Sequence, residues 1–228
     1  MRKEFDVLLL DVDGTLMDFN MAEKRGMEQV LRFYGIEPTT ERLDRYHVIN
    51  EQAWAAFERG EVTKEKLVTE RFVTFFGEMG KSVDGQEAED LYRSLLDKSD
   101  FLIDGALEIC AYLRERYDLY IVTNGTSSTQ YKRLAASGLD QYVKDIFVSE
   151  DAGSQKPQKE YFEYCFSRIP GADPSRMLLI GDSLHSDIQG GINGGCRTCW
   201  FNPEGRPALG EIRADYEIRR LEELKGFL

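Results

Sequence analysis

The sequence predicts an α/β fold, a doubly wound parallel sheet into which an α-helical cap domain is inserted. Three observations support this prediction. Apolar runs of strand length alternate with helical stretches, which is typical of a parallel sheet with helices on both faces. Each run is apolar enough for a strand that is buried on both sides, and each is followed directly by polar residues. The first run is separated from the second by a long interval that contains no strand-like segment.

Five runs are predicted as strands: residues 7–10, 119–122, 146–149, 177–180 and 198–201. In doubly wound sheets, ligands bind at the carboxyl ends of the strands. The polar residues that follow the runs are therefore expected together at one edge of the sheet. They are Asp11 and Asp13 after the first run, then Thr123 and Asn124, Glu150 and Asp151, Asp182, and Asn202.

The interval between the first two runs is predicted to form four helices, over residues 20–35, 39–60, 63–79 and a segment that begins at Asp84. Threonine and aspartate at the helix starts are favoured N-cap residues. A connection of this size is far longer than two parallel strands need. We therefore assign residues 1–18 and 101–228 to the core domain and residues 19–100 to an inserted helical cap domain.

The overall charge limits the class of partner. The chain has 228 residues and a formal net charge of −12 at pH 7. Because nucleic acid polymers and anionic membranes attract basic surfaces, neither is expected as a partner. No apolar run approaches the roughly 20 residues that span a bilayer, and no amino-terminal targeting signal is found. We expect a cytoplasmic protein, a monomer or a weak homodimer, that acts on a small molecule.

Two of the four cysteines, Cys196 and Cys199, form a CxxC pair. If residues 198–201 form a strand, positions three apart face opposite sides of the sheet and cannot readily share a metal. No second CxxC and no histidine pair accompanies them, as a zinc site would require. A zinc or redox site is therefore not expected here.

The most informative motif follows the first predicted strand. Asp11 and Asp13 are two residues apart, and side chains at this spacing share one face of a strand. Two carboxylates this close need a counter-ion, and a hard divalent cation such as Mg²⁺ prefers oxygen ligands. Gly14 permits a sharp exit from the strand. The sequence therefore predicts a magnesium site, with Mn²⁺ as an alternative ion.

Residues 11–15, Asp-Val-Asp-Gly-Thr, resemble the first motif of the haloacid dehalogenase superfamily, DxDGT. The remaining motifs follow in that family's order. Thr123 takes the position of the phosphate-binding hydroxyl, and Lys156, before Pro157, resembles the lysine of the third motif. Residues 181–187 resemble the fourth motif in its GDxxxxD form. Taken singly, a strand-end threonine is more often a capping residue and a lone lysine a solvated one, but the order of the motifs favours function.

The resemblance implies a Rossmann-like core and a role for each motif residue. Asp11 is the nucleophile and Asp13 the general acid and base. The metal is held by Asp11, the main-chain carbonyl of Asp13, and Asp182. The phosphoryl group is bound by Asp11, Thr123, Asn124 and Lys156, and Asp187 either binds a water of the metal or orients Lys156.

The implied reaction is magnesium-dependent hydrolysis of a phosphate monoester through an aspartyl-phosphate. Asp13 favours a phosphatase over a dehalogenase, because only a departing alcohol needs a proton. The residues after 119 are most similar to the pyrimidine 5'-nucleotidase branch of the capped phosphatases, which implies a nucleoside monophosphate as substrate. A sugar phosphatase or acylneuraminate-phosphate phosphatase would keep the same core residues and differ only in the cap. A phosphomutase and a non-catalytic phospho-acceptor switch are further alternatives.

Overall fold

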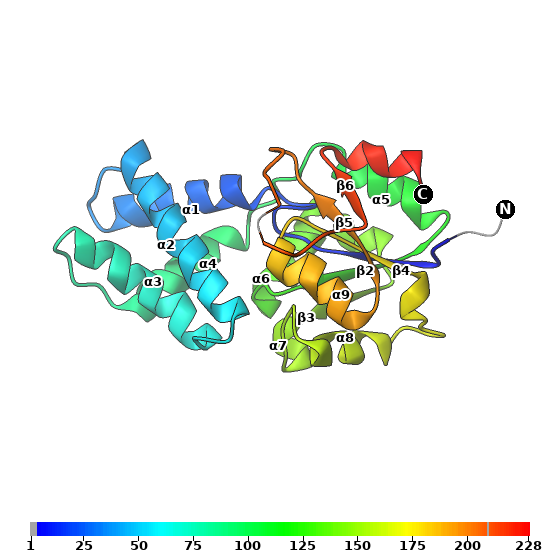
Figure 1. Ribbon diagram of the computed structural model, residues 1–228. Coiled ribbons are helices and arrows are strands. Elements are labelled where there is room, and N and C mark those ends of the chain that lie inside the picture. The colour runs from blue at the N-terminus through cyan, green and yellow to red at the C-terminus, as the bar shows by residue number, and fades with distance from the viewer. Residues whose placement is uncertain (1–3, 209) are drawn as a thin grey trace. The chain divides into compact units, whose positions relative to one another are not determined.

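The computed structural model describes residues 4–208 and 210–228, and the chain forms two compact units (Figure 1). Unit 1 contains the residues up to Phe19 together with Asp100–Leu228. Unit 2 is the stretch between them, Asn20–Ser99. The first strand is thus separated from the rest of its own unit by about eighty residues of sequence, as expected for an inserted domain.

Unit 1 is built on a six-stranded sheet with the strand order β3-β2-β1-β4-β5-β6. All neighbouring strands are parallel, which confirms the predicted α/β fold. The strands are β1 (Val7–Leu10), β2 (Asp118–Thr123), β3 (Asp145–Val148), β4 (Met177–Gly181), β5 (Arg197–Phe201) and β6 (Tyr216–Ile218). The sequence did not predict β6. Ser149, which was expected at the end of the third strand, instead begins the short helix α7 (Ser149–Ala152).

The register of the central strands brings their carboxyl ends level. Leu10 of β1 pairs with Ile121 of β2 on one side and with Ile180 of β4 on the other. The pairing continues one step further, because the amide of Asp11 donates to the carbonyl of Ile180 at 3.0 Å. The polar residues after these three strands therefore begin at the same edge of the sheet.

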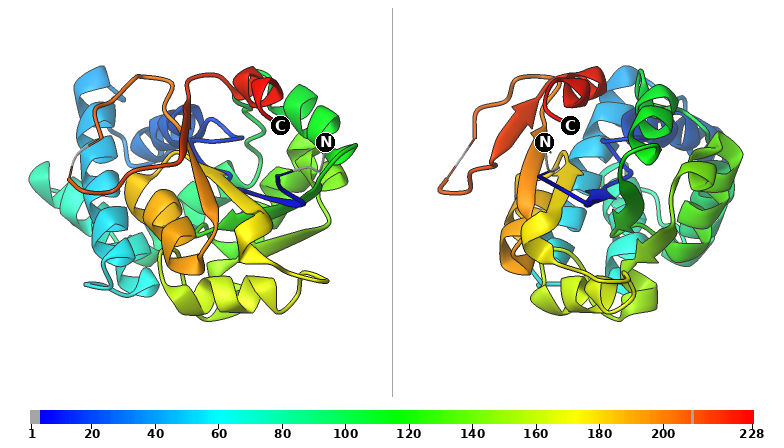
Figure 2. Two further views of the ribbon diagram at one scale, coloured as in Figure 1. Left: turned by 45° about the vertical axis from the view of Figure 1, so that its right-hand side comes forward. Right: turned by 90° about the vertical axis from the view of Figure 1, so that its right-hand side faces the viewer.

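Alternating residues of β1 pack into two different cores, one on each face of the sheet. Leu8 and Leu10 join a core that includes Ile109 of α5 (Ala106–Arg114). Leu9 joins the opposite core, which includes Phe162 of α8 (Lys159–Phe166). Helices thus cover both faces (Figure 2), and burial of each leucine contributes roughly 1.5–3 kcal/mol to folding. The sheet is doubly wound, as predicted.

The same two cores separate the cysteine pair. Cys196 belongs to the core that contains Leu9, whereas Cys199 belongs to the core that contains Leu8. All four cysteines are free and buried. The two cysteines therefore lie on opposite faces of the sheet, as the strand pattern predicted.

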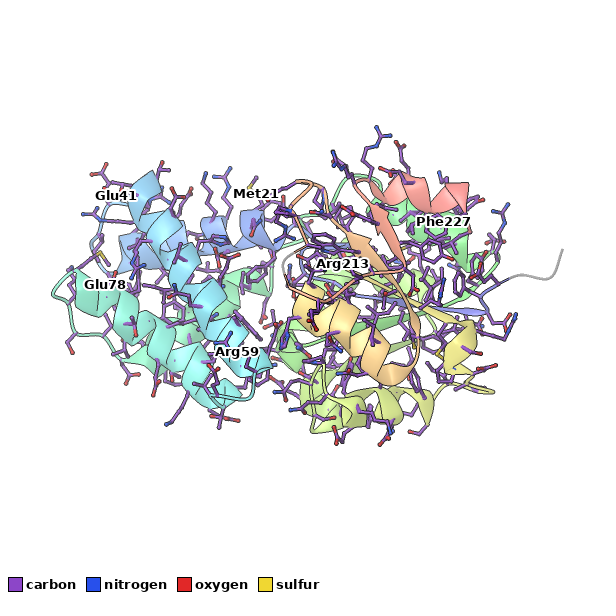
Figure 3. The ribbon with its side chains drawn as sticks, in the orientation of Figure 1. Met21, Glu41, Arg59, Glu78, Arg213 and Phe227 are labelled. Carbon is purple, nitrogen blue, oxygen red and sulfur yellow. The ribbon has the colours of Figure 1, made fainter. Side chains whose placement is uncertain are left out.

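The remaining helical segments of unit 1 connect the strands. They are α6 (Ser127–Ser137), η1 (Leu139–Tyr142), η2 (Pro174–Arg176), a π-helical turn η3 (Leu184–Ile188), α9 (Gln189–Gly194) and η4 (Leu221–Gly226). α9 packs closely against β5, because a Cβ on Gly191 would lie 2.5 Å from Thr198 Cγ2. After η4, the ring of Phe227, labelled in Figure 3, stacks on Tyr216 of β6 with a centroid distance of 4.7 Å.

Unit 2 consists of the four predicted helices, α1 (Phe19–Phe33), α2 (Thr40–Glu58), α3 (Lys64–Glu78) and α4 (Gly85–Leu96). Thr39, Thr63 and Asp84 each accept a backbone hydrogen bond at a helix start, as N-cap residues do. Figure 3 labels Glu41 and Arg59 at the two ends of α2. No helix within the described ranges has the length and apolar character needed to cross a membrane.

The interior of unit 2 combines aromatic packing with a chain of buried polar residues. Tyr46 stacks on Phe72 with a centroid distance of 5.5 Å. Beside these rings, Asn50 donates to Glu23 and accepts from Arg71, both at 2.6 Å. A buried charge is tolerated only when it is paired, and here each has a partner.

Candidate active site

The side chain of Lys156 lies at the centre of the candidate site. It is only 1% exposed, because it reaches from its loop into the site and not into solvent. The loop that carries Lys156 ends where α8 begins, at Lys159. Lys156 Nζ donates to Asp11 Oδ1 and Asp187 Oδ1, both at 2.7 Å, and to the carbonyl of Val122 at 2.9 Å. An ammonium group has three hydrogens, so all of them are engaged.

Asp11 is held at both of its carboxylate oxygens. Lys156 donates to Oδ1, and the hydroxyl of Thr15 donates to Oδ2 at 3.1 Å. The side chain is 6% exposed and follows the central strand of the sheet. Thr15 was quoted in the first motif, but the sequence assigned it no role.

Asn124 holds the loop that carries Lys156. Its Nδ2 donates to the carbonyl of Lys156, and its Oδ1 accepts from the amide of the same residue, both at 2.9 Å. This reciprocal pair fixes the backbone of Lys156 next to the end of β2. Binding of phosphate by Asn124 stays a prediction.

The hydroxyl group of Thr123 is oriented by two donors. Its Oγ1 accepts from the amide of Gly125 at 3.0 Å and from Gln130 Nε2 at 2.9 Å. A hydroxyl oxygen accepts two hydrogen bonds, so the hydroxyl hydrogen is left to donate to a further acceptor. A phosphoryl oxygen is an acceptor of this kind.

Asp11, Asp182 and Asp187 form a group of carboxylates whose nearest oxygens lie within 4.8 Å of one another. Asp187 is anchored, because Lys156 donates to its Oδ1 and the amide of Ser183 donates to its Oδ2 at 3.0 Å. Asp182 lies against the turn of the first motif, where a Cβ on Gly14 would be 2.6 Å from its Oδ2. The main-chain carbonyl of Asp182 accepts from Trp200 Nε1 at 2.9 Å.

The electrostatics of this group favour a cation. Burial raises the pKa of Asp11 to about 7, although the charge of Lys156 opposes the rise. Burial and the neighbouring charge of Asp11 raise the pKa of Asp182 well above its ordinary value. The pKa of Lys156 is also raised, because the charges of Asp11 and Asp187 outweigh the effect of burial. Three crowded carboxylates against one ammonium group fit a hard divalent cation, which would relieve their repulsion.

Asp13 contacts a different set of residues. Its Oδ1 accepts from Arg133 Nη1 and its Oδ2 from Gln130 Nε2, both at 2.5 Å. Because β1 ends at Leu10, the strand alternation that predicted a shared direction for Asp11 and Asp13 does not extend to Asp13. Its carboxylate is instead linked to Thr123 through Gln130. Neither Gln130 nor Arg133 was predicted from the sequence.

The other polar residues expected at this edge support the surrounding loops. Glu150 accepts from the amide of Ser127 at 2.9 Å, at the start of α6. Asp151 accepts from the hydroxyl of Ser127 at 3.0 Å. Asn202 holds the main chain of Arg206, to which it donates and from which it accepts at 2.9 Å.

Comparison with known proteins identifies the class. Residues 5–195 match the model of the haloacid dehalogenase-like hydrolases. The chain therefore belongs to this family, and within it the chain is a phosphatase-type hydrolase.

The similarity to three relatives extends over almost the whole chain. YfnB of Bacillus subtilis is 47% identical over 99% of this chain and 96% of its own length, and its name gives the hydrolase family without a substrate. Its magnesium-bound crystal structure superimposes with a TM-score of 0.94, covering 98% of each chain. The pyrimidine 5'-nucleotidase PynA of Streptococcus pneumoniae is 35% identical over 96% of this chain and 93% of its own. The pyrimidine 5'-nucleotidase YjjG of Escherichia coli is 29% identical over 99% of this chain and 98% of its own length.

Proposed function

We propose that this protein is a magnesium-dependent phosphatase that acts on pyrimidine nucleoside 5'-monophosphates through a phosphoryl group carried on Asp11. The observation that supports the chemistry best is the position of Asp11 after the central strand, with its carboxylate held by Lys156 and Thr15. A nucleophile that is fixed in this way reacts without having to be ordered first.

The reaction has two steps. A carboxylate oxygen of Asp11 forms a bond to phosphorus while the bond from phosphorus to the substrate's alcohol oxygen breaks, and Asp13 gives its proton to that oxygen. A water molecule then transfers a proton to Asp13 and attacks the same phosphorus, so that inorganic phosphate leaves and the Asp11 carboxylate is restored. Asp13 therefore regains its proton by the end of each catalytic cycle.

Positive charge and hydrogen-bond donors stabilise the transferring group. Thr123 supplies the hydroxyl hydrogen that its two donors leave free. Lys156 is a fixed counter-ion of Asp11 and Asp187, and it must exchange one of its three contacts to bind a phosphoryl oxygen. Phosphoryl transfer depends mainly on such positioning and electrostatic stabilisation.

The ligands proposed for Mg²⁺ are Asp11, Asp182 and the main-chain carbonyl of Asp13, with Asp187 in support. When bound, the ion supplies positive charge beside the phosphoryl oxygens. The oxygen-only donor set and the raised pKa of Asp182 favour a hard cation, and the crystal structure of YfnB contains magnesium. Mn²⁺ is the expected substitute.

The substrate class is proposed from the relatives, two of which are named pyrimidine 5'-nucleotidases. A sugar phosphate phosphatase is the second candidate, because an N-acylneuraminate-9-phosphatase of Mus musculus is 26% identical over 97% of this chain. The residues described above would serve either substrate equally well. The choice therefore rests on direct assay.

The test is a phosphate-release screen over nucleoside monophosphates and sugar phosphates, with Mg²⁺ and with a chelator. We expect pyrimidine nucleotides to be the best substrates and the chelator to abolish turnover. Asp11→Asn should lose at least about a thousandfold in kcat, as nucleophile variants do. Asp140→Asn, on an exposed residue of η1, is the matched control and should keep full activity.

Near-normal turnover by Asp11→Asn would refute the nucleophile. Faster turnover of sugar phosphates than of every nucleotide would refute the substrate class alone.

A further inference from the structure

The carboxylate of Asp13 is held by two side chains from one helix, although the helix begins more than a hundred residues later in the sequence. Gln130 and Arg133 lie 117 and 120 residues from Asp13, respectively, and each donates at 2.5 Å to a different oxygen of its carboxylate. They are three residues apart on α6, so they share one face of the helix. The two contacts fix both the position and the rotation of the carboxyl group.

Gln130 connects Asp13 to the hydroxyl of Thr123. Its Nε2 has two hydrogens, and the structure uses one for Asp13 and the other for Thr123 Oγ1. Space for this amide exists because residue 125 is a glycine: a Cβ there would lie 2.1 Å from Gln130 Nε2. Both Asp13 and Thr123 are therefore oriented by one buried side chain.

Arg133 is buried to an extent that is unusual for arginine, with 1% of its surface exposed. Its Nη1 contacts Asp13, and its guanidinium lies 5.8 Å from the ring centre of Phe19. Its Nε and Nη2 are buried without a hydrogen-bond partner among the described residues. A buried guanidinium with unused donors is costly, so stability alone does not explain this placement.

We infer that Gln130 and Arg133 are positioning residues, which fix the carboxyl group of Asp13 relative to the hydroxyl of Thr123 for transfer of a proton to the departing alcohol. The inference rests on the proposed function, since it assumes that Asp13 is the acid. Loosening Asp13 should slow only the reactions whose leaving group needs a proton. An alkoxide leaving group needs one, whereas p-nitrophenolate departs without it.

The experiment compares kcat/KM for a nucleoside monophosphate and for p-nitrophenyl phosphate in three variants, all measured with Mg²⁺. Gln130→Met keeps the length of the side chain, Arg133→Met keeps an unbranched apolar stem, and both remove the donors. We expect a loss of roughly 10- to 100-fold with the nucleotide and less than about threefold with the aryl ester. Arg133→Lys keeps the charge and should recover part of the loss with the nucleotide.

Lys132→Met, on an exposed residue of the same helix, and Gln141→Met, on an exposed residue of η1, are the matched controls. Equal losses with both esters would overturn the inference in favour of a structural role, and unchanged kinetics would overturn it outright. If Arg133→Met does not fold, Gln130→Met, which removes no charge, decides the matter by the same comparison. Failure of the proposed function would look different, because it would show in wild type itself: neither ester would be hydrolysed if the chemistry is wrong, and only the aryl ester if the substrate class is wrong.

Discussion

At the scale of single residues, Gly14 shows why the first motif needs a glycine. Its φ is +84°, a region where an L side chain is strained by about 1–2 kcal/mol. A Cβ at this position would also lie 2.6 Å from Asp182 Oδ2. The turn after Asp13 is therefore shaped around the carboxylate of Asp182, a residue far away in the sequence.

Gly14→Ala should weaken metal binding, because the new methyl group displaces Asp182. We expect the Mg²⁺ concentration for half-maximal activity to rise about 10- to 100-fold, the range seen when groups that position metal ligands are lost. Gly153→Ala is the matched control, since φ there is +68° and nothing lies within 4 Å of the added Cβ. That variant should lose stability and keep its Mg²⁺ requirement. The same Mg²⁺ requirement in both variants would contradict the prediction.

Some residues of the candidate site can be predicted from a short sequence motif, whereas others cannot. Asp11, Lys156 and Asp182 were predicted because each lies in a short motif next to a strand or a proline. Gln130 and Arg133 were missed because their partner Asp13 is more than a hundred residues away, and nothing in α6 distinguishes them from surface positions. The burial of Arg133 follows from tertiary structure alone.

At the scale of elements, α9 depends on close contact with the sheet. Gly191 approaches β5 so closely that a Cβ would lie 2.5 Å from Thr198 Cγ2 and 3.5 Å from Leu179 Cβ. The helix follows directly from η3, which carries Asp187. Packing of α9 thus fixes an element of the site as well as the core.

Gly191→Ala should destabilise unit 1 by about 1–3 kcal/mol, the usual cost of overpacking a core. The measurement is urea denaturation followed by the fluorescence of Trp200 in a Trp54→Phe background. Gly226→Ala is the control, because Gly226 lies in η4 of the same unit and has nothing within 4 Å of an added Cβ. A helical glycine of that kind gains stability on substitution. Equal effects at the two glycines would show that packing against β5 is not the cause.

The elements that the sequence failed to predict are those with little local signal. β6 has three residues, Tyr216–Ile218, with only the last of them buried, and such a strand forms because β5 offers it a pairing edge. The five longer runs were predicted because an unbroken apolar segment of this length must be buried, and a central strand of a parallel sheet buries both of its faces. The start of α8 at Lys159 was not predicted, since helix ends depend on loop contacts such as the pair between Asn124 and Lys156.

At the scale of the whole molecule, the two units differ in what holds their interiors together. Unit 1 has apolar cores on both faces of its sheet, whereas unit 2 contains the polar chain that runs from His47 through Glu23 and Asn50 to Arg71. His47 Nδ1 lies 2.7 Å from Glu23 Oε1. Burial raises the pKa of Glu23. Burial alone would lower the pKa of His47, but the hydrogen bond and charge of Glu23 raise it above 6.5.

Unit 2 should therefore lose stability as the pH rises. A group whose pKa is higher in the folded state stabilises that state fully below its unfolded pKa, and this contribution is lost as the pH rises through the folded pKa. For His47 the window begins near 6.5 and extends upward. We expect the melting temperature of unit 2, followed by Trp54 fluorescence in a Trp200→Phe background, to fall between about pH 6 and pH 8.

His47→Gln should flatten this dependence, because it removes the group that titrates in the window. His185→Gln changes the other histidine, which lies in unit 1, and should leave the dependence as it is in wild type. If the melting temperature of His47→Gln fell by the same amount over this pH range, the effect would belong to other groups.

The pairing of β1 with β4 determines when the site can form as the chain is synthesised. A ribosome that has released the chain as far as β3 has exposed Asp11 and Thr123, but the ammonium group that lies 145 residues beyond Asp11 is still to be synthesised. Contacts of such long range form slowly, because the entropy of closing the intervening chain must be overcome first. On the proposed mechanism, hydrolytic competence is acquired once, after the fourth strand has inserted beside the first.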